Sequence, residues 1–147
     1  MMTLSRRQGR VTTGSIVGIG GLAVGGLLVW SLFGQDVKLC KRVLTGLIQG
    51  NQAVRQHIDW DHLTALDVDV GATYTQIQDA QEQAIYQRMF VQKFAEGFAQ
   101  ASADASVFTG WRAQGDGTVT VDYPAKSKTL VFRLSESGKQ IAGVAWQ

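Results

Sequence analysis

The chain has 147 residues, with 14 Lys and Arg against 12 Asp and Glu, and its net charge is +2. Three of the bases, Arg6, Arg7 and Arg10, lie at the N-terminus, so the rest of the chain is nearly neutral. That balance argues against nucleic-acid binding, which needs a basic face to displace counterions from phosphates. The single cysteine, Cys40, excludes an intrachain disulfide and a zinc site built from several cysteines. With only 2 histidines besides, we expect no bound metal and no cofactor.

An uncharged, mostly apolar segment follows the basic residues 1–10 and extends over residues 11–35. About 20 apolar residues in a helix cross the hydrocarbon core of a bilayer. Trp30 and Phe33 lie near the far end of this segment, where aromatic rings suit the membrane interface. We therefore predict one transmembrane helix over 11–35. The basic start and apolar run also fit a cleaved signal peptide, although no small-residue cleavage site follows them.

Four glycines are spaced four, three and four residues apart within this segment: Gly14, Gly18, Gly21 and Gly25. At helical spacing they form one stripe, and small residues in a stripe let membrane helices approach closely. The stripe predicts contact with another membrane-protein subunit or with a second copy of the chain. The alternative is that glycine is simply frequent in membrane helices.

Basic residues lie on both sides of the apolar segment. The three N-terminal arginines favour a cytoplasmic N-terminus by the positive-inside rule, but Lys38, Lys41 and Arg42 lie just beyond the other end. We place residues 1–10 in the cytoplasm, the helix in the cell (inner) membrane, and residues 36–147 in the periplasm or outside the cell.

The first half of residues 36–147 has helical periodicity. Asp36 can cap a helix whose apolar residues recur at helical spacing up to Gly50, which is a stop signal. A shorter helix is expected over about 52–66, a connector over 67–73, and a long helix over about 74–103.

After Ala105 the apolar period changes from helical spacing to alternation, which predicts strands. The segment 115–117, Gly-Asp-Gly, is a hairpin turn signal, and alternation is clearest in 118–123. Further strands are expected around Leu130 and over 140–146. Helices followed by an antiparallel meander predict an α+β domain with helices packed on one face of a three- to four-stranded antiparallel sheet.

The order of these elements, the Ile58-Asp59-Trp60 turn and the ending 138–144, with Gln140 where the family has tryptophan, resemble a known superfamily. Residues 36–147 resemble the nuclear-transport-factor-two-like, or cystatin-like, cone, which implies a curved sheet. With a short tail and one membrane helix, the whole chain is similar to VirB-eight-like scaffold subunits of bacterial secretion systems. The resemblance implies a non-catalytic protein of the bacterial envelope whose domain mediates protein–protein assembly. Other members of the superfamily are enzymes or bind ligands in the cone, so a membrane-anchored ligand-binding protein or enzyme is the alternative.

Few residues are candidates for catalysis or ligand binding. Asp59 and His62 are the candidates for a general base at the mouth of the cone, but Asp59 can equally cap a turn and His62 can be solvated. Candidates for lining a ligand cavity are Trp60, Tyr74, Phe94 and Trp111. A wider aromatic set either lines such a cavity or packs as ordinary core: Phe90, Phe94, Phe98, Trp111, Phe132 and Trp146.

Overall fold

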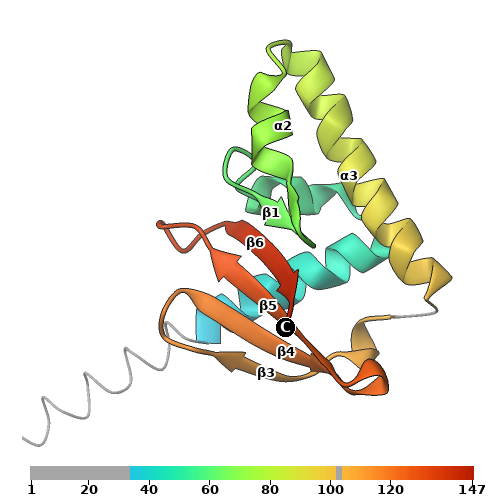
Figure 1. The fold of residues 1–147 in the computed structure, drawn as a ribbon, viewed down its shortest axis with the longest axis vertical. Helices are drawn as coiled ribbons and strands as arrows, with labels where there is room; N and C mark the ends of the chain where they lie inside the picture. The colour runs from blue at the N-terminus through green and yellow to red at the C-terminus, as the bar shows by residue number, and fades with distance from the viewer. Residues whose placement is uncertain (1–33, 102–103) are drawn as a thin grey trace, which may run out of the picture. The chain divides into compact units, whose positions relative to one another are not determined.

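The computed structural model describes residues 34–101 and 104–147, and residues 35–147 form one compact unit (Figure 1). The predicted transmembrane helix lies outside the described residues except for its last two positions, and so do its four glycines. Among the described residues, no helix is both long enough and apolar enough to cross a bilayer.

The first described segment, residues 34–49, is helical, as the periodicity predicts. Its inward side chains are spaced three or four residues apart and are almost fully buried: Cys40, Val43, Leu44 and Leu47. Gly50 follows with a φ of +69°, the left-handed conformation in which helices often end. The Asn51 side chain then accepts a hydrogen bond from the backbone N–H of Ala53 and caps the next element.

The region between the first helix and the helical hairpin differs from the prediction. The helix expected over 52–66 is only a 3-10 helix, η1 (Gln52–His57), and the expected connector contains a strand and the start of a helix. Strands β1 (Thr64–Ala65) and β2 (Val68–Asp69) are joined by a two-residue turn. Its residues, Leu66 and Asp67, have φ values of 50° and 70°, a conformation that usually selects glycine or asparagine. Two-residue strands joined through such a turn leave no periodicity in the sequence.

The long helix expected over 74–103 is divided in two. Helix α2 (Val70–Gln76) ends before an extended residue, Ile77, and α3 (Ala80–Gln100) begins after Asp79. The Asp79 carboxylate accepts a hydrogen bond from the backbone N–H of Gln81, which stabilises this new start. The two helices run in opposite directions and meet at this turn (Figure 1).

The strands predicted in the second half of the chain are confirmed, but the sheet contains more strands than predicted. They are β3 (Thr109–Ala113), β4 (Thr118–Tyr123), β5 (Lys128–Leu134) and β6 (Ile141–Trp146). Short 3-10 helices, η2 (Ala105–Val107) and η3 (Pro124–Lys126), precede β3 and β5.

The sheet has six strands in the order β2-β1-β6-β5-β4-β3. The four long strands pair antiparallel, as predicted, but β1 pairs parallel to β6, so the sheet is mixed. The expectation of three or four antiparallel strands was wrong because β1 and β2 were taken as helix and connector.

One hydrophobic core joins the helices to the sheet. Alternate residues of β4 and β5, Val119, Val121, Leu130 and Phe132, are at most 1% exposed and belong to the same cluster as the first helix. The domain is therefore α+β, with helices packed against a six-stranded mixed sheet.

Candidate functional site

An open cleft of about 470 Å³ lies between α3 and the sheet. Its apolar walls are formed by Leu66, Phe90, Phe94, Gly97, Phe98, Ala101, Tyr123 and Trp146. Three lysines complete the lining: Lys93, Lys126 and Lys128. We call this site the aromatic cleft.

The helix side of the aromatic cleft is open because few side chains of α3 are buried. Of its 21 residues only Val91 is buried. Phe90, Phe94 and Phe98 are four residues apart, so they share one face of the helix, and each stays half-buried. Their ring centroids are 5.9 and 5.1 Å apart along the row. Such a row spans about 12 Å of helix, from the rise of about 1.5 Å per residue.

The sheet side is formed by stacked aromatic rings. Tyr123 at the end of β4 stacks on Trp146 at the end of β6, with centroids 6.0 Å apart. Phe108 stacks on Tyr123 at 5.2 Å and meets Phe98 edge-on at 5.8 Å. Aromatic contact therefore continues from α3 to the sheet around one end of the cleft.

Every charged side chain lining the aromatic cleft is a lysine. Two ion pairs occur among the described residues, His62–Asp59 and Arg112–Asp122, and neither involves a lysine of the cleft. The ammonium of Lys128 lies 5.7 Å from the centroid of the Trp146 ring, a cation–π distance. Apolar walls and positive charges, with no carboxylate in the lining, suit a ligand with an apolar body and an anionic group.

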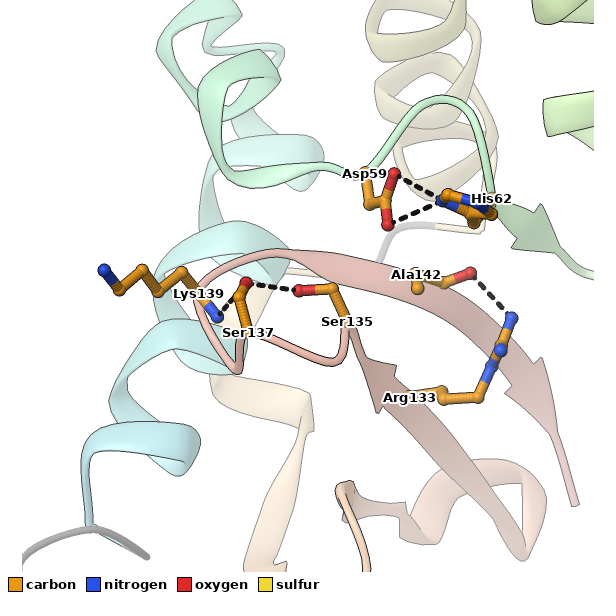
Figure 2. A network of polar contacts seen from close by, with 7 residues as sticks. All are labelled: Asp59, His62, Arg133, Ser135, Ser137, Lys139 and Ala142. Atoms are coloured by element: carbon orange, nitrogen blue, oxygen red, sulfur yellow. Dashed lines mark hydrogen bonds and ion pairs between the residues drawn. The ribbon is translucent and has the colours of Figure 1, made fainter.

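The predicted catalytic candidates lie together, but in a different place. Nδ1 of His62 is 3.1 and 3.0 Å from the two carboxylate oxygens of Asp59 (Figure 2). The side chains are 75% and 21% exposed, respectively. They line a depression of about 410 Å³, and neither lines the aromatic cleft.

The opposite rim of this depression is the β5–β6 connection. Arg133 donates a hydrogen bond to the carbonyl of Ala142 at 3.1 Å, and the hydroxyls of Ser135 and Ser137 are 3.0 Å apart (Figure 2). The Ser137 hydroxyl accepts a hydrogen bond from the backbone N–H of Lys139 at 3.3 Å. These contacts close the turn locally. Within residues 34–101 and 104–147, no three His, Cys, Asp or Glu side chains are grouped as metal ligands.

Of the four residues predicted to line a ligand cavity, three belong to one run of aromatic contacts and only one lines the aromatic cleft. Phe94 lines the aromatic cleft. Trp60 is 7% exposed, and its indole N–H donates to the Arg55 carbonyl at 3.0 Å. Tyr74 is half-buried, with its ring centroid 5.9 Å from that of Trp60. Trp111 is half-buried in another place, stacked on Phe132 at 5.9 Å.

Three members of the wider aromatic set, Phe90, Phe98 and Trp146, also line the cleft, whereas Phe132 is fully buried in the core. Sequence reasoning missed Leu66, Tyr123 and the three lysines. One signal was available, because Lys93, Gly97 and Ala101 each follow a phenylalanine of the row by three residues and so lie beside it on the helix.

Cys40 is a core residue rather than a nucleophile. It is completely buried, and burial, helped by the nearby Asp36 carboxylate, raises the pKa of its thiol to about 12. A thiol with such a pKa stays protonated at neutral pH, and only the thiolate is reactive.

Comparison of the chain with protein-family models, curated proteins and solved structures found no match.

Proposed function

We propose that the chain is a non-catalytic, single-pass membrane protein whose α+β domain mediates protein–protein assembly in a membrane complex, as a scaffold of the secretion or envelope type. In this proposal residues 11–35 span the cell (inner) membrane, residues 1–10 are cytoplasmic, and the domain is periplasmic or extracellular. The uncharged apolar segment supports the anchor. A helix, a hairpin, a helical pair and a four-stranded meander in that order support a relationship to the nuclear-transport-factor-two-like cone.

The observation that carries the assembly proposal is the exposure of α3. Ile85 and Met89 lie one turn apart on this helix and are each 48% exposed. Neither lines the aromatic cleft, so α3 also exposes apolar side chains outside it. Helix α3 has only one buried residue but carries these apolar side chains. Exposed apolar side chains of this kind favour an interface with another protein.

The positions of the polar residues support binding rather than bond making. A general base works best when it lies in a pocket that holds its substrate and excludes water. His62 is 75% exposed and is hydrogen-bonded to Asp59, and the only charged side chains lining the aromatic cleft are lysines.

Co-purification tests the assembly proposal. The full-length chain, extracted from the membranes of its own cells, should elute with a stoichiometric partner or as a homo-oligomer. Gly18→Leu combined with Gly21→Leu should weaken that association, because leucine would separate the packed helices. Ala23→Leu, in the same segment but off the stripe, is the matched control and should leave the association intact. A monodisperse monomer, with function unchanged by the glycine substitutions, would overturn the proposal.

A second function is favoured by the aromatic cleft itself. Its volume of about 470 Å³ falls in the range of about 300–1,000 Å³ typical of small-molecule sites. The domain would then hold a small ligand at the membrane surface, in addition to or in place of a protein partner.

A further inference from the structure

The geometry points to a free, single-chain anionic amphiphile, a long-chain carboxylate, as the occupant of the aromatic cleft. This inference rests on the second of the two functions proposed above. The residues that carry it are the phenylalanine row of α3, Gly97, and the three lysines that line the cleft.

The apolar part of the ligand is defined by the walls. The row Phe90, Phe94 and Phe98 offers about 12 Å of aromatic surface along the helix axis. Gly97 leaves room beside this row, because a Cβ placed there would meet no heavy atom within 4 Å. An alkyl chain lying along the row would lose its contact with water, and each buried methylene would strengthen binding about fourfold.

The charged part of the ligand is defined by Lys93, Lys126 and Lys128. No carboxylate lines the cleft, and no ion pair among the described residues uses these ammonium groups. A carboxylate head would receive charge-assisted hydrogen bonds from these lysines while the chain stays on the rings. A cationic head on the same chain would be repelled there.

The size of the cleft favours a small molecule over a protein segment. A row of about 12 Å would contact only about two turns of a docked helix. A stable protein interface buries about 800 Å² on each partner, far more than such a contact provides. A volume of about 470 Å³ also suits one acyl chain better than the two of a phospholipid.

Photolabelling of the full-length chain in phosphatidylcholine nanodiscs tests the inference. The probe is dodecanoate carrying a diazirine near the end of its chain, and labelled positions are mapped by mass spectrometry. Adducts are expected within residues 90–101 and at Tyr123 or Trp146. A trimethylammonium probe with the same chain should label these positions about tenfold less, since its charge opposes the lysines.

Two variants with matched controls separate specific binding from partition into the bilayer. Gly97→Leu fills the cleft while improving helix propensity, so labelling should fall about tenfold in a folded chain. Ala99→Leu, on the same helix outside the lining, should leave labelling within about twofold of the wild type. Lys126→Gln combined with Lys128→Gln should reduce carboxylate labelling about tenfold, and Lys139→Gln, outside the cleft, should not.

The inference would be overturned by equal labelling by the cationic probe, by wild-type labelling of the Gly97→Leu chain, or by adducts confined to residues 11–35. Loss of labelling when phosphatidylglycerol replaces phosphatidylcholine would assign the cleft to a membrane lipid and also contradict it. If the probe failed to label the cleft in native membranes and a protein were cross-linked there, the cleft would be assigned to a protein partner. Co-purification of a partner by a chain that fails to label would overturn this inference and leave the assembly proposal standing.

Discussion

The ammonium of Lys128 lies 5.7 Å from the ring centroid of Trp146, and both residues line the aromatic cleft. Leu130 pairs with Trp146 across β5 and β6, and residues two apart share a face of a strand, so Lys128 lies on the side of the sheet that Trp146 occupies. The strand register therefore places a positive charge beside an aromatic wall.

Replacing Lys128 with glutamine should hardly affect folding. The exposed cation–π contact contributes about 0.5–1 kcal/mol, so the free energy of unfolding should fall by no more than about 1 kcal/mol. Urea unfolding of the full-length chain, followed by tryptophan fluorescence, measures this change. A loss of several kcal/mol would mean that Lys128 supports the fold rather than the chemistry of the cleft.

Gly97 and Gly46 should respond in opposite ways to alanine. Gly97→Ala should raise the free energy of unfolding by about 1 kcal/mol, because alanine favours the helix and nothing lies within 4 Å of its Cβ. Gly46→Ala places its Cβ against the side chain of Val54, which is 3% exposed in the core. That crowding should cost about 1–3 kcal/mol. Urea midpoints of the two variants compare them directly, and equal shifts of the same sign would contradict the packing described here.

The Asp122 carboxylate should make stability depend on pH in acid. Two hydrogen bonds from Arg112, at 2.9 and 3.0 Å, together with its charge, hold the pKa of Asp122 below its ordinary value of 3.8. A carboxyl with a depressed folded-state pKa contributes its full stability above the unfolded-state pKa, and the contribution is lost as pH falls through the folded-state value.

Asp122→Asn should therefore lose less stability than the wild type between neutral pH and about pH 3. The pKa values of Asp104 and Asp116 are also lowered, by hydrogen bonds from Ser106 and Thr118, so the variant keeps part of the dependence. Urea midpoints at the two pH values give the comparison, with exposed Glu136→Gln as the control. A dependence identical to that of the wild type would exclude a role for the Arg112 pair.

Cys40 should resist alkylation until the domain unfolds. Its thiol is fully buried, and its pKa of about 12 leaves almost no thiolate at neutral pH. Iodoacetamide should therefore label it at least about a hundredfold more slowly in the native chain than in concentrated urea, because reaction requires opening of the core. Rapid labelling of the native chain, followed by mass spectrometry, would show that the first helix does not pack as described.

Long elements with a clear period were predictable from the sequence. The first helix has its apolar residues at helical spacing, and β4 alternates, so both were located within a few residues. The shortest elements were not predictable. Strands β1 and β2 have two residues each, and their turn uses Leu66 and Asp67 rather than a glycine. Only pairing with β6, far away in the sequence, makes β1 a strand.

The candidate site was predictable only in its aromatic part. The spacing of Phe90, Phe94 and Phe98 indicates one helix face, but a sequence does not show whether that face is covered. Helix α3 begins after Asp79 and has only one buried residue, so the phenylalanine row stays half-exposed. Lys126 and Lys128 reach the same cleft through the β4–β5 connection, and no local pattern joins them to α3.

Attachment to a membrane through residues 11–35 is tested most directly by fractionating cells that produce the full-length chain. After an alkaline carbonate wash, which removes peripheral proteins, the chain should remain in the membrane pellet and enter solution only with detergent. Recovery of the intact 16.0 kDa chain in the aqueous supernatant without detergent would contradict the anchor, and with it the proposed membrane assembly.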